Sequence, residues 1–176
     1  MRVSRKQVEE NKQTILTAAG RLFRERGFDA VTVTDIMKSA GLTHGGFYGY
    51  FKSKDDLIAQ TLAELKIEND AAKNDVVAQI ERYLSPEHRD NFASGCPLAA
   101  LAAETIRQSE PARDEMSARL QQQIAQLSEA MDDRDAEASR RAAIGSWSAM
   151  VGALILARMT ADSAFSDEIL GETAAW

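Results

Sequence analysis

Residues 41–57, GLTHGGFYGYFKSKDDL, contain several side chains of the kinds that bind phosphates. Threonine, tyrosine and lysine side chains, together with the free N–H groups at a helix N-terminus, are the groups that contact phosphates. The segment carries them at Thr43, Tyr48 and Lys54. Their chemistry is therefore that of holding a phosphate backbone, with no nucleophile–base pair among them.

The same segment contains three glycines inside a stretch with the length and capping of a helix, at Gly45, Gly46 and Gly49. Each costs roughly 0.5–1 kcal/mol relative to alanine in a helix interior. A helix that must approach another molecule closely benefits from small residues at the points of contact. The alternative is that the glycines allow tight packing against a neighbouring helix.

The elements around this segment have the pattern of a helix-turn-helix. An apolar stripe predicts a first helix over residues 8–26, ended by Gly27. Thr32 and Asp35 form a variant capping box that starts a second, short helix, which Gly41 ends. A third helix follows at once over residues 43–51, and a fourth begins after Ser53. Two short helices joined through one glycine, after a longer helix, are typical of this motif.

The rest of the chain also has helical signals, and no run of alternating residues predicts a strand. A helix restarts at Ser85–Pro86, and Pro97 and Pro111 each occupy the start of another. Apolar residues predict two more helices over residues 135–161 and 166–174. The predicted fold is therefore all-α.

Composition limits the possible functions. The 176 residues are 44% hydrophobic and 27% charged, as in ordinary globular proteins. Residues 1–54 hold ten Lys/Arg and five Asp/Glu, whereas residues 55–176 hold eleven and twenty-two. A basic N-terminal third on an acidic body predicts that one end meets a polyanion. The alternative is a chance fluctuation of surface charge.

The remaining chemistry-bearing residues are few. A single cysteine, Cys96, excludes an internal disulfide and a cysteine-cluster metal site, and His44 and His88 lack ligand spacing. We expect no cofactor and no metal. The most apolar run, residues 142–157, is shorter than the ~20 residues that a membrane span needs. We therefore interpret it as a buried helix, and expect no membrane partner and a cytoplasmic location.

Residues 14–62 resemble the DNA-binding domain of the TetR/AcrR transcriptional regulators. The resemblance rests on Gly27-Phe28, Thr32, Ile36 and Gly41-Leu42-Thr43, and on the pattern Tyr48-x-x-Phe51-x-Ser53-Lys54-x-x-Leu57. It implies an N-terminal three-helix helix-turn-helix domain and a helical C-terminal domain for ligand binding and dimerisation. The implied boundaries are residues 1–54, with the following helix to about residue 66, and residues 67–176.

The resemblance also implies which residues contact DNA. These are Thr32, Thr34, Thr43, His44, Gly45, Gly46, Tyr48, Tyr50 and Lys54. Members of the family often carry Lys or Arg at the position of His44 and a larger polar residue at that of Gly49. Both departures remove side chains that could contact bases or phosphates directly. Sequence specificity is therefore expected to depend on Tyr50, His44, Thr34 and DNA shape.

By the same resemblance, the chain is expected to be a ligand-responsive regulator, a repressor that binds a palindromic operator as a homodimer. A small-molecule effector of unknown identity would release it. Candidate pocket residues are Phe92, Cys96, Leu98, Leu101, Ile106, Met116, Leu120, Trp147 and Met150. The alternative for each of them is an ordinary place in the core.

A dimer interface can be argued from spacing. Small residues at intervals of three and four let two helices pack closely, and the final helix adds apolar side chains. The candidates are Gly145, Ser148, Ala149, Gly152, Ala153, Ile155, Phe165 and Ile169. A core helix of a monomer is the alternative.

Two further residues invite two interpretations each. Cys96 precedes Pro97 at a predicted helix N-terminus, where the dipole lowers a thiol pKa, so it is a candidate sensor of electrophiles or oxidants. It is otherwise a small buried hydrophobe. Glu104 is an acidic residue on an otherwise apolar helix, and a solvated face is the simpler explanation.

Two other functions compete with a specific regulator. A helical enzyme or carrier would use the apolar body, but the sequence shows no HExxH, phosphate loop or nucleophile–base pairing. We therefore expect no enzymatic activity. A nucleic-acid binder without sequence preference would share the basic segment and is distinguished by its affinity for random DNA.

Overall fold

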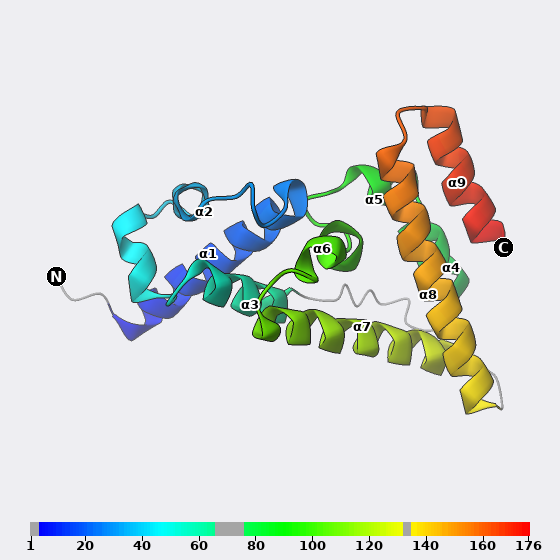
Figure 1. The fold of residues 1–176 in the computed structure, drawn as a ribbon, viewed down its shortest axis with the longest axis horizontal. Helices are drawn as coiled ribbons and strands as arrows, with labels where there is room; N and C mark the ends of the chain where they lie inside the picture. Colours follow the sequence, from blue (N-terminus) through cyan, green and yellow to red (C-terminus); the bar gives the residue numbers. More distant parts are fainter. Residues whose placement is uncertain (1–3, 66–75, 132–134) are drawn as a thin grey trace. The chain divides into compact units, whose positions relative to one another are not determined.

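The computed structural model describes residues 4–65, 76–131 and 135–176, and in this part of the chain every regular element is helical. Figure 1 shows the elements in chain order from blue to red. They are α1 (Arg5–Arg26), α2 (Val33–Ser39), η1 (His44–Gly49), α3 (Lys54–Glu64), α4 (Val76–Tyr83), α5 (Pro86–Asp90), α6 (Pro97–Thr105), α7 (Glu110–Ala130), α8 (Ala136–Met159) and α9 (Ser163–Ala175). The predicted all-α fold is confirmed.

The chain divides into two compact units. The first, called here the N-terminal unit, contains the residues up to Leu65 together with Ala100–Met116. The second, called here the C-terminal unit, contains the other described residues. The predicted boundary at residues 66–67 lies outside the described residues. Most of α6 and the start of α7, which we predicted to belong to the C-terminal domain, pack with the N-terminal helices.

The core of the N-terminal unit forms where α1 packs against α2 and α3. The predicted apolar stripe of α1, from Ile15 to Phe23, faces inward. Its members that are buried are Ile15, Leu16, Ala19, Leu22 and Phe23. Phe47 and Phe51 fill the space next to η1, with ring centroids 5.6 Å apart in a stacked arrangement. Burying each large apolar side chain contributes about 1.5–3 kcal/mol, which offsets the poor helix propensity of the glycines around it.

The starts of α2 and α3 are fixed by the caps that the sequence predicts. The Thr32 hydroxyl accepts the Asp35 backbone N–H, and the Asp35 carboxylate accepts the Thr32 backbone N–H at 3.0 Å, completing the capping box. Ser53 caps α3 in the same way through the Asp56 N–H at 3.1 Å. The Asp56 carboxylate reaches one residue further back, to the Lys52 N–H at 2.8 Å.

Acidification should loosen both caps. Hydrogen bonds from Thr32 hold the pKa of Asp35 below its ordinary value, and the Lys52 N–H does the same for Asp56. A lowered folded-state pKa means that the stabilisation is complete above the unfolded pKa of about 4 and is lost as the pH falls below it. We expect the thermal midpoint, followed by circular dichroism from pH 7 to 3, to fall more steeply for the wild type than for the double variant Asp35→Asn/Asp56→Asn. Parallel curves would contradict this role of the carboxylates.

The third element differs from its prediction. The helix predicted over residues 43–51 is a 3₁₀ helix that spans His44–Gly49. Thr43 is the N-cap residue, but its side chain makes no capping hydrogen bond. Three glycines in six residues leave little propensity for the wider helix, and short 3₁₀ segments tolerate such sequences. Gly41, with φ at +71°, makes the turn that joins α2 to η1.

The C-terminal unit is dominated by the antiparallel pair α8 and α9, which lie side by side in Figure 1. Asp135 caps α8 and Asp162 caps α9, each through backbone N–H groups two and three residues ahead. By length and composition α8 could cross a membrane, with a mean hydropathy of 1.4 over its most apolar window. Its inward side, however, is buried in the protein at Ala143, Trp147 and Leu154.

Candidate functional site

The residues predicted to contact DNA from the start of α2 and from η1 lie on the surface of the N-terminal unit. We call them the α2–η1 surface, defined by Thr32, Thr34, Thr43, His44, Gly45 and Tyr48, all of which are exposed. Tyr48 is 73% exposed, although it stands next to the buried Phe47. The phenol is therefore available to an outside partner, while the buried Phe47 ring anchors the element.

Two of the three glycines of η1 are not needed for close packing within the chain. A Cβ atom added to Gly45 or Gly49 would meet nothing within 4 Å. One added to Gly46 would only touch Met37, Thr43 and Tyr50 at 3.8–4.0 Å, an ordinary contact distance. None of the three has a positive φ. The fold therefore does not require glycine at residues 45 and 49, which favours close approach by an outside partner.

A side-chain hydrogen bond joins the two elements of the surface. The Thr34 hydroxyl and His44 Nδ1 are 3.1 Å apart, which ties α2 to the first residue of η1. If the hydroxyl donates, Nε2 carries the imidazole proton and offers a donor to a phosphate or a base. If Nδ1 donates, Nε2 is an acceptor. In both tautomers, one ring nitrogen orients the ring and the other remains for a ligand.

The Tyr50 side chain is held by a hydrogen bond from a residue that the sequence patterns did not indicate. Asn11 on α1 donates from its side-chain amide to the Tyr50 hydroxyl oxygen at 2.9 Å, and Gln7 donates to Asn11 at 3.0 Å. The tyrosine O–H remains free to donate outward, so α1 orients this side chain from 39 residues away. A long-range pair of this kind leaves no periodic signal in the sequence.

Lys54 and Thr32 already make hydrogen bonds to other groups of the same chain. Lys54 is half-buried, and its Nζ donates to the Phe28 carbonyl at 2.5 Å. An ammonium has three donors, so two remain for a phosphate. The Thr32 hydroxyl accepts from the Asp35 N–H and donates to the Asp35 carboxylate, which leaves one lone pair. Both side chains are thus held in place before any ligand binds.

In the C-terminal unit, His88 joins the end of α4 to the start of α6. The Cys96 N–H donates to His88 Nε2 at 3.1 Å, so Nε2 is unprotonated and the ring proton sits on Nδ1. Nδ1 donates to the Tyr83 carbonyl at 2.6 Å. The Tyr83 ring packs against His88 and, with centroids 5.1 Å apart, against Trp147. Burial raises the pKa of the Tyr83 phenol, as does Cys96 beside it. Cys96 itself is half-buried.

Arg158 on α8 contacts the same region of the C-terminal unit. Its guanidinium donates to the carbonyls of His88 and Arg89 at 3.0 and 2.9 Å, at the C-terminal end of α5. It also lies 4.5 Å from the ring centroid of Phe92. Burial lowers the pKa of this arginine, and the carbonyls and the aromatic ring replace the water that it loses.

The candidate pocket residues are distributed over both units. Those buried are Leu98, Leu101, Met116, Trp147 and Met150. Phe92, Ile106 and Leu120 are exposed. Leu101, Ile106 and Met116 belong to the N-terminal unit, and the other six, Cys96 included, to the C-terminal unit.

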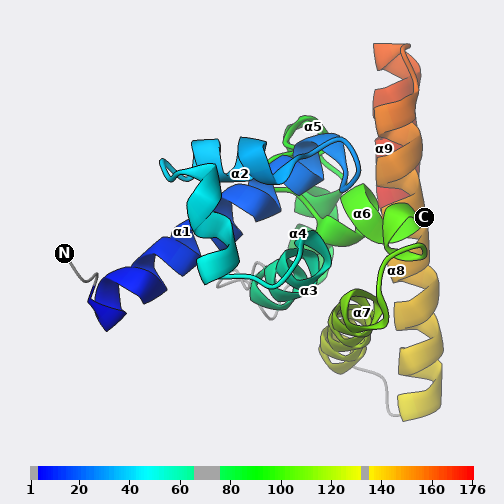
Figure 2. The ribbon, with the colours of Figure 1, turned by 60° about the vertical axis from the view of Figure 1, so that its left-hand side comes forward.

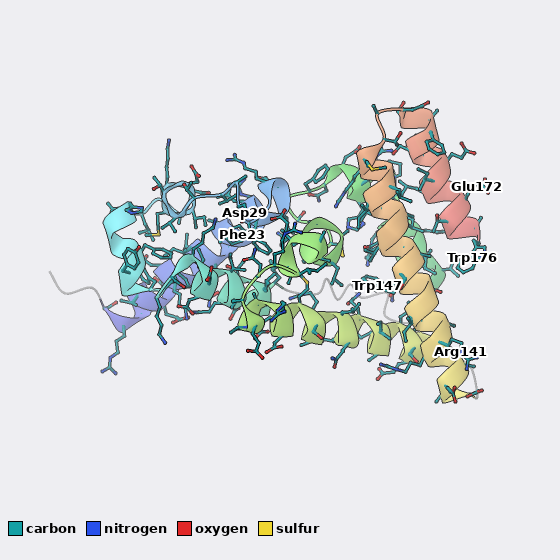
Figure 3. All side chains as sticks on the ribbon, in the orientation of Figure 1. Phe23, Asp29, Arg141, Trp147, Glu172 and Trp176 are labelled. Carbon is teal, nitrogen blue, oxygen red and sulfur yellow. The ribbon has the colours of Figure 1, made fainter. Side chains whose placement is uncertain are left out.

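The candidate dimer residues lie mostly on one face of α8 and α9. Gly145, Ser148, Ile155 and Phe165 are exposed, and Ala149, Gly152 and Ile169 are half-buried. Ala153 instead lies in the core of its own chain. A hollow of about 530 Å³ on this face is lined by Ala149, Phe165, Glu168, Ile169, Glu172, Thr173 and Trp176. Figure 3 labels Glu172 and Trp176 at this end of α9.

A helix-turn-helix unit with an exposed surface of hydroxyl and imidazole groups, together with a second helical unit, is typical of a DNA-binding transcriptional regulator. Comparison with known proteins gives the particular family. Residues 15–61 match the model of bacterial regulatory proteins of the tetR family, and residues 74–169 match that of the LmrA/YxaF-like transcriptional regulator C-terminal domain. The chain belongs to the TetR family of transcriptional regulators, and it is therefore a regulator and not an enzyme.

Individual relatives agree with this assignment. The regulator HbdR of Aromatoleum sp. is 34% identical over 84 residues, 48% of this chain and 35% of that protein. The repressor NemR of Escherichia coli is 28% identical over 136 residues, 70% of this chain and 68% of that protein. The aligned segment thus spans about a third of the length of HbdR and two thirds of that of NemR.

Solved structures share the fold over nearly the whole chain. The reduced form of E. coli NemR has a TM-score of 0.76 at 22% identity and covers 94% of both chains. A TetR-family regulator from Agrobacterium tumefaciens also has a TM-score of 0.76, at 20% identity, covering 96% of this chain and 97% of its own.

Proposed function

We propose that this regulator is a homodimeric, cytoplasmic repressor that binds a palindromic operator and is released by a small-molecule effector. The observation that carries the proposal is the exposed α2–η1 surface with Tyr48 at its centre. One such surface per chain recognises one half-site. Two copies related by a two-fold axis would recognise inverted half-sites about one DNA turn, roughly 34–36 Å, apart.

The apolar face of α8 and α9 supports the homodimer. Ile155 on α8 is 43% exposed and Phe165 on α9 is 52% exposed, and the small residues Gly145, Ser148, Ala149 and Gly152 precede Ile155 along α8. A two-fold interface uses the same patch on both chains, so it would bury this face twice. The other occupant to consider is a lipid surface, but α9 carries Glu168 and Glu172 beside the apolar residues, which suits a protein partner better.

Effector binding is supported by polar atoms of the C-terminal unit that are buried and make no hydrogen bond. These are Gln123 Oε1, Ser139 Oγ and Trp147 Nε1. Leaving such a group unpaired costs roughly 1–3 kcal/mol, so a ligand that pairs with them gains that free energy. We propose an aromatic or otherwise flat effector with both donor and acceptor groups, bound against Tyr83 and Trp147. It would shift the dimer away from the DNA-binding shape by binding one conformation better.

Specific binding is tested by titration with two duplexes of equal length at physiological salt. One carries the DNA upstream of the protein's own coding sequence and the other a random sequence. We expect at least a hundredfold preference for the first, because specific sites are typically bound 10³–10⁷ times more tightly. Equal affinities would indicate a binder without sequence preference.

Tyr48→Phe tests the surface itself. The change removes one exposed hydroxyl and preserves the ring, so we expect affinity for every duplex to fall by about tenfold, because hydrogen bonds to charged groups contribute roughly 1.5–3 kcal/mol. Ser117→Ala is the control, since it also removes one exposed hydroxyl but lies on α7 in the C-terminal unit. An unchanged affinity in Tyr48→Phe, or an equal loss in both variants, would remove Tyr48 from the interface.

A further inference from the structure

The turn after α1 is held from both sides by side chains distant in sequence. The Phe28 backbone N–H donates to the Glu104 carboxylate on α6 at 2.7 Å. The Phe28 carbonyl accepts from Lys54 Nζ on α3 at 2.5 Å. Glu104 is half-buried, so the solvated face expected for it is not what the structure shows. All three residues lie in the N-terminal unit.

Gly27, the residue before this turn, leaves room for the Glu104 side chain. Gly27 ends α1 with φ at +81°, a conformation that favours glycine. A Cβ atom at this position would also collide with the Glu104 carboxylate. Phe28 is fully buried, with its ring packed edge-on against Phe23 at 5.1 Å. The turn is thus fixed by a buried ring, by the ammonium of Lys54 and by one carboxylate from α6.

The position of the turn determines where the α2–η1 surface begins. Only residues 29–31 separate Phe28 from Thr32, the N-cap residue of α2, and Val31 in this connector is fully buried. Thr34 follows in the first turn of α2 and is bonded to His44 of η1. A shift of the Phe28 turn would therefore be carried along the chain to the residues that face DNA.

We propose that Glu104 is a positioning residue for DNA binding, acting through the Phe28 N–H, and that residues 100–116 complete the DNA-binding unit. Figure 2 shows α6 and the end of α1, which this bond connects. The inference rests on the proposed function only in that DNA is the ligand. A charge-assisted hydrogen bond to a backbone N–H is among the stronger kinds, and the Glu104 carboxylate accepts one from Phe28.

Four variants of the full-length protein test the proposal. Glu104→Ala removes the acceptor, and Glu104→Asp preserves the charge but shortens the side chain by one methylene. Glu104→Gln retains an oxygen at the same reach. Asp114→Ala, at an exposed position in the same segment, is the control. Each is titrated with the upstream duplex and examined without DNA by hydrogen exchange of residues 27–34.

We expect Glu104→Ala and Glu104→Asp to bind the upstream duplex about ten- to thirtyfold more weakly and to exchange faster at residues 27–34. Glu104→Gln should remain within about threefold of the wild type, and Asp114→Ala should match it. Should the alanine variant not fold, the aspartate variant carries the same comparison.

Three results would overturn the inference: unchanged exchange at residues 27–34 in Glu104→Ala and Glu104→Asp, unchanged affinity in both, or a loss in Glu104→Gln equal to that in Glu104→Ala. If the wild type itself shows no preference for the upstream duplex, the proposed function fails. The exchange measurement then still decides whether Glu104 holds the turn.

Discussion

Replacing Ile155 and Phe165 together by aspartate should convert the protein into folded monomers that no longer bind the upstream duplex tightly. Both side chains are already about half exposed in the single chain, at 43% and 52%. The substitutions therefore remove little from the core of each protomer. Their effect should be confined to association.

The expected size follows from symmetry. Each aspartate would appear twice in a two-fold interface, giving four charged groups in an apolar contact. At roughly 1–3 kcal/mol for each buried polar group without a partner, the dimer is destabilised by at least about 4 kcal/mol. This corresponds to on the order of a thousandfold in the dissociation constant. A monomer engages one half-site only, so the affinity for the full operator falls with the dimer.

Sedimentation velocity and duplex titration measure the two effects on the same samples. Val77→Asp is the matched control, because Val77 is an apolar residue of the same unit that is 65% exposed and lies on α4. A double variant that remains dimeric while the thermal midpoint is unchanged would show that another surface holds the dimer together.

Local rules predicted much of the fold because they act over few residues. The capping residues Thr32 and Ser53 stand where the sequence placed them, and the helix restart at Ser85–Pro86 is confirmed by α5. The stripe of α1 is buried as its spacing predicted. Each of these features is encoded within three to eight neighbouring residues, so no tertiary information was needed.

The features that the sequence did not predict depend on distant partners. The role of Glu104 depends on a turn 76 residues away, and the orientation of Tyr50 depends on Asn11. Neither pair has a compositional signature. The 3₁₀ geometry of η1 reflects a balance between glycine propensity and the burial of Phe47, which spacing alone does not resolve. Ala153 similarly followed the small-residue spacing but lies on the inward side of α8.

These distant contacts share one consequence for the site. Asn11, Glu104 and the Thr34–His44 pair each fix an element that carries candidate DNA contacts, without contributing charge to the surface. Fixing these side chains before DNA arrives reduces the entropy that binding must remove. Such support matters more here than in a surface rich in arginine, because glycines occupy three of the six residues of η1.

Replacing the glycines of η1 by alanine should change stability and DNA affinity in opposite directions. Gly45→Ala and Gly49→Ala should each raise the free energy of unfolding, by about 0.5–1 kcal/mol, because alanine loses less backbone entropy than glycine. Neither added methyl group meets any atom within 4 Å, and neither position has a positive φ. Nothing in the folded chain therefore opposes the gain.

The same substitutions should weaken DNA binding at least tenfold. A methyl group at residue 45 or 49 occupies space that the DNA must enter if η1 approaches it closely, and steric overlap at a packed interface is not relieved without moving the helix. The opposite signs exclude a general folding defect as the cause. Chemical unfolding monitored by circular dichroism and titration with the upstream duplex measure the two quantities.

Gly171→Ala is the matched control for this prediction. Gly171 is an exposed residue of α9 whose added Cβ would also meet nothing within 4 Å, and it does not line the hollow between α8 and α9. It should gain stability with no change in affinity for DNA. If Gly45→Ala and Gly49→Ala, like Gly171→Ala, leave the affinity for DNA unchanged, then η1 does not approach DNA closely at residues 45 and 49. The two glycines would then have no role in binding.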